Sequence, residues 1–208
     1  MKNRHKTTPS LKRRFNGLLP IVIDVETSGL QAATHALLEI AMVQLGMNEE
    51  GKLFPSQTTA YHVEPFVGAV LEPHALAING IDPFHPLRFA IPEKQMLCRV
   101  FERVQMQLAE THCYRAVLVG HNAWFDLSFI LAATRRANLH RIPLHTFTVL
   151  DTASLAAMVL GETVLARAAR RARIAFNIAE AHSAIYDVER TAELFCYMVN
   201  NTNRLQNF

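Results

Sequence analysis

The chain has 208 residues, of which half are hydrophobic and 19% are charged, so an intrinsically disordered chain is excluded and one globular domain is the simplest expectation. The net charge of +3 is uneven, because residues 1–16 hold six basic side chains and no acid, which leaves 15 basic and 18 acidic residues elsewhere. We expect a basic N-terminal arm, residues 1–16, and a slightly acidic domain, residues 17–208. The arm favours a polyanionic partner, although a solvated terminus explains its first residues equally well.

The cysteines and the hydrophobic runs indicate a compartment. Cys98, Cys113 and Cys196 are odd in number and lack the spacing of a metal site, which is typical of reduced thiols in a cytoplasmic protein. No apolar run approaches the 18 residues of a membrane-spanning helix, and the run 18–23 contains Pro20 and leads into acidic residues. We therefore expect a cytoplasmic protein with no membrane segment.

The expected elements follow from hydrophobic periodicity and from turn residues. Strands are predicted at 18–23 with its continuation to 27, 37–45, 58–63, 116–119 and 147–150, and helices at 72–78, 93–108, 124–138, from 152 onward, 163–173 and 183–199. The first three strands are joined by short turns and form an antiparallel meander, and helices alternate with strands after it. This order predicts an α/β fold with a mixed five-stranded sheet flanked by helices.

Two acids stand at the end of the first strand. Asp24 and Glu26 are two residues apart, so a strand projects both from one face, and the run before them is apolar on both faces, as in a buried central strand. Buried carboxylates must be protonated, paired with a cation or bound to a metal ion. The alternative is that the strand ends at Ile23 and both acids face water in a turn.

Two helices each place one more acid on an apolar face. At 100° per residue, Asp126 falls among the apolar residues of helix 124–138, and Asp187 falls among those of helix 183–199. A single buried acid is often no more than a satisfied hydrogen-bond acceptor. Four inward-facing acids on three elements favour a site for hard divalent cations, which prefer carboxylate oxygens.

The residues near these acids suggest separate roles. His182 precedes Asp187 by five residues, and a histidine titrates near neutrality and can take a proton from water, although alone it is more typical of a surface residue. His121 ends a strand and is expected to cap local backbone. Asp151 precedes a helix, so we interpret it as an N-cap rather than a fifth metal ligand. Five further histidines have no pattern of acidic residues around them and are expected in loops: His35, His74, His85, His140 and His145.

Three segments together resemble a known superfamily. Asp24-Val25-Glu26-Thr27, the segment 121–126 (HNAWFD) and the segment 182–187 (HSAIYD) resemble, in order, the three motifs of the DEDD exonucleases with a histidine before the last acid. Segments 62–66, 75–83 and 181–184 further resemble the ribonuclease T family, over nearly the whole chain. The resemblance implies a ribonuclease H-like fold, a homodimer, and removal of nucleotides from RNA 3′ ends, including those of transfer RNA.

The chemistry that this resemblance implies is two-metal hydrolysis. Two Mg²⁺ ions, or Mn²⁺ in their place, would be held by the four acids; one would activate water and the other would stabilise the leaving 3′ oxygen. His182 would accept the proton of the water. Nucleoside 5′-monophosphates would leave one at a time.

The residues expected to bind substrate depart in part from the family. Ribonuclease T enzymes tend to line the terminal-nucleotide pocket with phenylalanines and a glutamate; Phe125 and Phe147 match, whereas Leu30, His74 and Ile78 occupy the other places. We therefore expect a weaker grip on the terminal nucleotide and less discrimination between bases.

Positions that resemble RNA contacts of the family are basic. Arg14 and Arg115 are kept, while His140 replaces a lysine. The basic helix 163–173 is either a further RNA contact or a solvated face. Two other functions remain open at this point: a proofreading- or repair-type DNA exonuclease, which would use the same four acids, and a catalytically silent RNA-binding protein.

Overall fold

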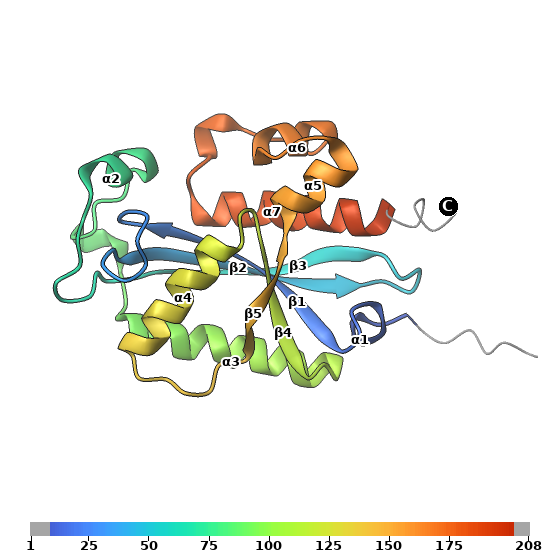
Figure 1. Ribbon diagram of the computed structural model, residues 1–208, viewed down its shortest axis with the longest axis horizontal. Helices are drawn as coiled ribbons and strands as arrows, with labels where there is room; N and C mark the ends of the chain where they lie inside the picture. The colour runs from blue at the N-terminus through green and yellow to red at the C-terminus, as the bar shows by residue number, and fades with distance from the viewer. Residues whose placement is uncertain (1–8, 202–208) are drawn as a thin grey trace, which may run out of the picture.

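The computed structural model describes residues 9–201, whose five strands form one sheet in the order β3-β2-β1-β4-β5 (Figure 1). β1 is antiparallel to β2, and β2 is antiparallel to β3, whereas β4 runs parallel to both β1 and β5. The strands are β1 Leu18–Thr27, β2 Leu37–Met47, β3 Leu53–His62, β4 Arg115–Gly120 and β5 Leu144–Asp151. This arrangement confirms the predicted mixed five-stranded α/β sheet.

The helices lie on both faces of this sheet. α7 packs across β1, β2 and β3 with α5 and α6 beside it, while α3 and α4 contact each other on the opposite side (Figure 1). The helical segments are α1 Leu11–Arg14, α2 Pro73–Asn79, η1 Pro86–Arg88, α3 Glu93–Thr111, α4 Trp124–Arg136, α5 Thr152–Leu160, α6 Leu165–Arg171, η2 Ile178–Glu180 and α7 Ala184–Asn201. The expected helices therefore exist, and their ends differ from the predicted ones by a few residues.

β1 is the central strand, and it does not stop before the acids. Asp24 pairs with Ala41 and Glu26 pairs with Glu39, so the strand continues to Thr27. The residues before them are buried on both faces because β2, β4 and two layers of helices surround the strand. The alternative in which both acids face water in a turn is therefore wrong.

β3 begins earlier than its hydrophobic pattern indicates. The strand starts at Leu53 rather than at residue 58, and residues 54–58 are exposed because β3 is an edge strand. Pro55 is tolerated there, beside a register shift after Gln44, since an edge strand can lack one backbone donor. Because both faces of this part of the edge strand are exposed, it lacks the alternation of apolar and polar residues from which strands are predicted. β5 is likewise longer than predicted, starting at Leu144.

Part of the basic arm already belongs to the folded body. Lys2, Arg4 and Lys6 lie outside the described residues, whereas Leu11 in α1 is buried in the main core. Within residues 9–201, no single helix is both long and apolar enough to cross a membrane, although α5 and α6, bent by 42°, pass the same length and composition test together.

Candidate active site

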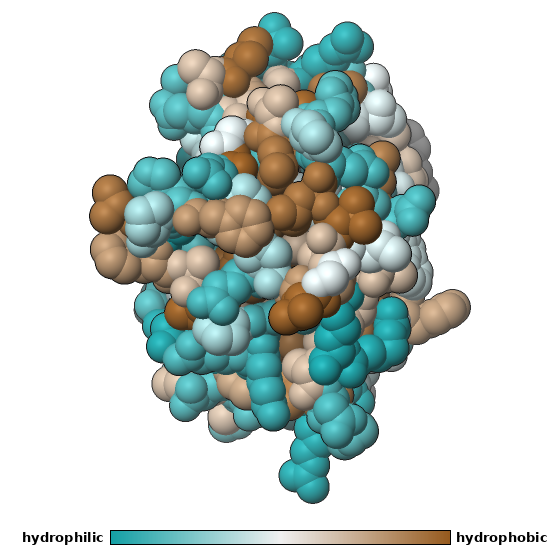
Figure 2. Space-filling model, turned by 90° about the vertical axis from the view of Figure 1, so that its left-hand side faces the viewer, coloured by the Kyte–Doolittle hydropathy of each residue, from teal (hydrophilic) through white to brown (hydrophobic). Residues whose placement is uncertain are grey.

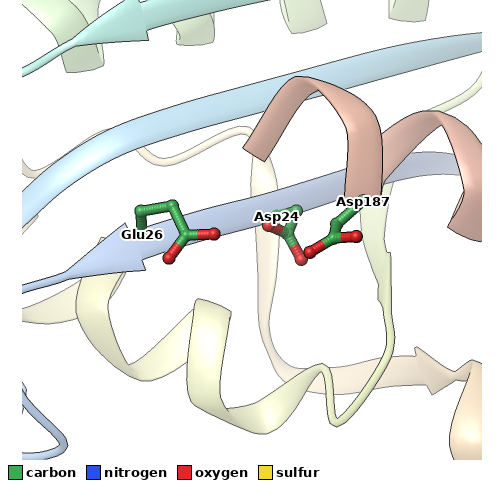
Figure 3. A group of neighbouring side chains, drawn as sticks. All are labelled: Asp24, Glu26 and Asp187. Carbon is green, nitrogen blue, oxygen red and sulfur yellow. The ribbon is translucent and has the colours of Figure 1, made fainter. Parts of the chain in front are cut away.

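Three carboxylates from two elements meet at one end of the sheet. Asp24 and Glu26 project from the α7-facing side of β1, and Asp187 reaches them from the first turn of α7 (Figure 3). One oxygen of each lies within 4.8 Å of an oxygen of the other two. α7 is held over β1 by its apolar face, which includes the fully buried Val188, so Asp187 enters the site as its helical spacing predicts.

The fourth acid, Asp126, approaches the same strand from α4. Its side chain is 3% exposed, and Oδ1 accepts a hydrogen bond of 3.0 Å from the backbone N–H of Val25. A Cβ at Gly120 would lie 3.2 Å from Asp126 Oδ2 and 3.2 Å from the Ile23 carbonyl oxygen, so the glycine at the end of β4 allows this close approach. Asp126 does not belong to the group formed by the other three acids. It is nevertheless held close enough to Asp24 for its charge to raise the pKa of Asp24.

The surroundings of the four acids disfavour the ionised form of each carboxyl group. Burial, followed by the charge of Asp126, raises the pKa of Asp24 well above its usual value. Burial and the charge of Asp187 raise the pKa of Glu26 to about 8, and burial raises the pKa of Asp126 to about 8. Burial also raises the pKa of Asp187. Ionised, this group requires positive charge close by.

These residues fit a hard divalent cation. Asp187 Oδ1 is buried, yet no hydrogen-bond donor reaches it from the part of the chain that the structure describes. A buried acceptor without a donor is costly, and a cation satisfies it. Carboxylate oxygens are the ligands that Mg²⁺ and Mn²⁺ prefer.

His182 lies beside Asp187 on the turn that precedes α7. Its backbone N–H donates a hydrogen bond of 2.9 Å to Asp187 Oδ2, and its φ of 68° places it in the left-handed region. The residue is exposed, so its imidazole is accessible to water. A histidine within five residues of the last acid is thus attached to that acid through its backbone.

Glu39 is a buried acid that the sequence reasoning missed. It lies opposite Glu26 in the β1–β2 register, its Oε1 lies 3.0 Å from His62 Nδ1, and its Oε2 accepts a hydrogen bond from Ala184 N at the start of α7. Its charge also contributes to the raised pKa of Glu26. The available signal was a charged residue at an inward position of the apolar run 37–45.

Asp151 is an N-cap, as predicted. Its carboxylate accepts from Ser154 N at 3.0 Å, and it also accepts from Asn122 N at 2.8 Å and Ala123 N at 3.2 Å. The expectation that His121 caps local backbone is wrong. Its Nε2 lies 2.7 Å from the carbonyl oxygen of Thr163, 42 residues away. Both residues hold the turn between β4 and α4 in place, and α4 carries Asp126.

Comparison with known proteins identifies the family. The exonuclease family model matches residues 21–195. Ribonuclease T from Yersinia enterocolitica is 53% identical over 196 residues, covering 94% of this chain and 91% of the relative, and ribonuclease T from Salmonella typhimurium is 52% identical over 192 residues, covering 92% and 89%. The chain belongs to the ribonuclease T family of the DEDD exonucleases.

Solved structures show the same fold at lower identity. E. coli exonuclease I in complex with a dT13 oligonucleotide matches with a TM-score of 0.69 and 17% identity over 91% of this chain, which spans 43% of that chain. A 3′-exonuclease described as recognising the 3′ end of histone mRNA stem-loop matches with a TM-score of 0.69 and 15% identity, covering 88% and 63%. The ribonuclease H-like exonuclease fold predicted from the sequence is confirmed.

The pocket residues predicted from the ribonuclease T family are mostly exposed near the acids. Leu30 follows β1 and is 80% exposed, while Ile78 and His74 lie exposed on α2. Figure 2 shows this end of the molecule, where hydrophobic side chains gather between polar ones. Phe147 is 76% exposed and contacts the Trp124 ring edge-on at 6.1 Å between centroids. Trp124 was not singled out from the sequence, because its place in the helix pattern does not reveal its exposure.

Phe125 differs from the other pocket residues in its packing. Its ring is half-buried and lies 4.9 Å from that of Phe129, between centroids, at the edge of the main core. Residues four positions apart lie on the same face of a helix, so the two rings pack against each other along α4. Phe125 therefore supports α4 next to Asp126, and its part in substrate binding stays a prediction.

The predicted basic RNA contacts lie away from the acids. Arg14 donates to the Val199 carbonyl oxygen at 2.8 Å, and Arg115 donates to the Ile142 carbonyl oxygen at 2.9 Å. Arg115 also lines a cavity of about 570 Å³. The residues that line this cavity are Gln105, Leu108, Tyr114, Arg115, His140, Arg141, Ile142, Pro143 and Thr146. The positive charges of Arg115 and Arg141 in this lining suit a phosphate backbone.

Proposed function

We propose that this 3′–5′ exonuclease is a metal-dependent exoribonuclease that trims the 3′ ends of transfer RNA and other stable RNAs. The observation that carries the proposal is the group formed by Asp24, Glu26 and Asp187, whose oxygens lie within 4.8 Å of one another, with one buried oxygen lacking a donor. Family membership supports the exonuclease chemistry. The RNA substrate rests on the names of the ribonuclease T relatives.

Four residues of the chain would hold the metal ions. Asp24, Glu26, Asp126 and Asp187 are the ligands that we assign to two Mg²⁺ ions, with Mn²⁺ as a substitute. When bound, such ions lower the pKa of water and balance the charge of the leaving oxygen. Without them, four ionised acids would repel an RNA phosphate.

The chain's own residues would position RNA and move the proton. His182, exposed next to Asp187, would accept the proton from the attacking water at an imidazole nitrogen. Leu30 and Ile78 would contact the terminal base, and Phe147 with Trp124 offers an exposed aromatic surface for stacking. Since leucine and isoleucine stack less well than aromatic rings, we expect little discrimination between terminal bases.

The proposal includes a homodimer in the cytoplasm. The basic cavity at Arg115 lies at the start of β4, whereas the acids surround its end, so a second subunit could present this surface to the acids of the first. Cytoplasmic location is supported by three free thiols, Cys98, Cys113 and Cys196. His140 and the arginines of α6 would add to the RNA-binding charge.

One assay tests the proposed function. End-labelled RNA with a 3′ overhang, and a DNA strand of the same sequence, are incubated with the enzyme in Mg²⁺ or in chelator. We expect stepwise shortening of the RNA from its 3′ end in Mg²⁺ alone, with DNA degraded more slowly. Faster degradation of DNA would favour the repair-type exonuclease, and binding without turnover would favour the silent RNA-binding protein.

A further inference from the structure

α2 lies next to the acid site but is not held there by burial. The helix spans only Pro73–Asn79, and none of its residues is buried. A helix of seven residues is not stable on its own, and most helices are held by an apolar face. Ala75 and Leu76 are only half-buried, so polar contacts at the two ends of α2 contribute to its position and to that of the exposed Ile78.

The first end of α2 is fixed by a buried histidine. His35 is 3% exposed, and its Nε2 lies 2.9 Å from Oε1 of Glu72, the N-cap residue of α2. Glu72 N also donates to the Ser28 carbonyl oxygen at 2.9 Å. His35 was expected to be a loop histidine without a carboxylate partner. It instead connects the segment after β1 to the start of α2, because its partner lies 37 residues away in the sequence.

The second end of α2 is fixed by Asn79, which contacts β1 directly. Its Nδ2 donates to the carbonyl oxygen of Thr27, the residue after Glu26, at 3.1 Å. A hydrogen bond from the same amide lowers the pKa of the Glu26 carboxyl, against the larger effect of burial. Its Oδ1 accepts from Ile81 N at 3.1 Å, which fixes the orientation of the amide. With Oδ1 engaged as an acceptor, the Nδ2 side of the amide faces the end of β1 that carries Glu26 and Thr27.

We propose that Asn79 is a positioning residue, whose amide holds the Glu26 carboxylate in the orientation that a divalent cation requires while anchoring α2 beside the acids. Carboxylates that bind metal are commonly oriented by a second hydrogen bond, and loss of that partner costs about 10- to 100-fold in metal affinity or activity. The inference rests on the proposed metal-dependent function. Under this inference, the side chain of Asn79 links α2, which carries Ile78, to the metal ligand Glu26.

The test measures metal binding as well as turnover. Mn²⁺ is titrated into the full-length chain and followed by electron paramagnetic resonance, while kcat and KM for RNA are measured as a function of Mg²⁺. Asn79→Leu, which keeps the size of the side chain but removes both donors, is expected to weaken Mn²⁺ binding about 10-fold. It should also shift the Mg²⁺ requirement of kcat upward by a similar factor. Asn79→Ala should behave alike, which covers a failure of the leucine variant to fold.

Two controls separate positioning from general loosening. Glu72→Ala breaks the His35 contact at the other end of α2, and Asn48→Leu removes an amide in the turn between β2 and β3, away from the acids. Both should keep Mn²⁺ affinity within about threefold of wild type, whatever their melting temperatures. An equal loss in Glu72→Ala, or unchanged Mn²⁺ affinity in both Asn79 variants, would overturn the proposal.

The same measurements distinguish this inference from the proposed function. A wild type that shortens RNA, combined with Asn79 variants that bind Mn²⁺ normally, overturns the role of Asn79 alone. A wild type that binds Mn²⁺ but leaves RNA intact overturns the proposed activity, and the comparison of metal affinities still decides the role of Asn79.

Discussion

At the scale of single residues, the buried acids determine how stability depends on pH. The pKa of Glu26 and of Asp126 is raised to about 8 in the folded chain, mainly by burial, whereas these groups ionise near pH 4 when unfolded. Between about pH 4 and pH 8 the folded chain therefore binds more protons than the unfolded chain, and the free energy of unfolding falls as pH rises. In chelator, we expect the melting temperature to fall between pH 5 and pH 8.5, and Mg²⁺ to reverse that fall. Thermal melts check this, and a melting temperature that rises with pH in chelator would contradict it.

Neutralising one acid should separate activity from stability. Asp126→Asn keeps an oxygen that can accept from Val25 N but removes a buried charge. We expect most activity to be lost, because metal catalysis depends on its ligands. In chelator at pH 8 the variant should melt higher than wild type, because a costly ionisation is gone. Asp24→Asn, Glu26→Gln and Asp187→Asn should likewise lose most activity, and near-normal turnover in any two of the four variants would refute the ligand assignment.

His182 is exposed, so its replacement should affect catalysis more than folding. We use His182→Asn beside His182→Ala, because asparagine tolerates the left-handed backbone at φ 68°. Both keep the backbone N–H that donates to Asp187. The expected loss in kcat is about 10²- to 10⁴-fold, the usual contribution of a general base. Single-turnover rates on labelled RNA measure it, and a loss below threefold would mean that another group takes the proton.

At the scale of elements, Asp151 shows how an acid near the site can be structural. It caps α5 and also binds the N–H groups of Asn122 and Ala123, which lead into α4. Asp151→Ala should lower the free energy of unfolding by about 1–2 kcal/mol, the cost of a lost N-cap. Mn²⁺ affinity should stay within threefold of wild type. Denaturant unfolding and Mn²⁺ titration measure the two effects, and a tenfold loss of affinity with unchanged stability would make Asp151 a ligand.

Elements with a clear apolar period were predictable, and elements at the margin were not. β1, α3 and α7 carry buried residues at the spacing of their structure, so they appear in the sequence close to their observed ends. The start of β3 does not, because residues 54–58 face solvent along a free edge. The turn α1 was not predicted either, since it has a single buried residue, Leu11.

At the scale of the whole molecule, the acids of the site were predictable, but the contacts that hold them were only partly so. Each acid contradicts the apolar pattern of its own element, which is a local signal. Glu39 with His62, Glu72 with His35 and Asn79 with Thr27 are pairs of polar residues from different elements. No local pattern connects residues that are 23 to 52 positions apart, and only the folded sheet brings them together.

The separation of acids and bases across the molecule leads to a prediction about assembly. Arg115 opens β4 and Gly120 ends it next to Asp126, so strand geometry places the basic cavity roughly 16 Å from the acid end. In the proposed dimer, the basic surface of one subunit serves the acids of the other. RNA binding should therefore weaken steeply with salt, and less steeply after Arg115→Glu with Arg141→Glu, since fewer phosphates are contacted.

Mixing two inactive variants tests this arrangement. Asp24→Asn lacks the metal site, and the Arg115→Glu, Arg141→Glu double variant lacks the basic surface. If the surface acts across the interface, a mixed dimer holds one complete site, formed by the acids of one subunit and the basic residues of the other. Random exchange in an equal mixture should then restore about a quarter of wild-type activity, because half of the dimers are mixed and each has one working site. If each subunit works alone, the mixture will show only the average of the two variants. Sedimentation that shows a fully active monomer at the assay concentration would refute the dimer itself.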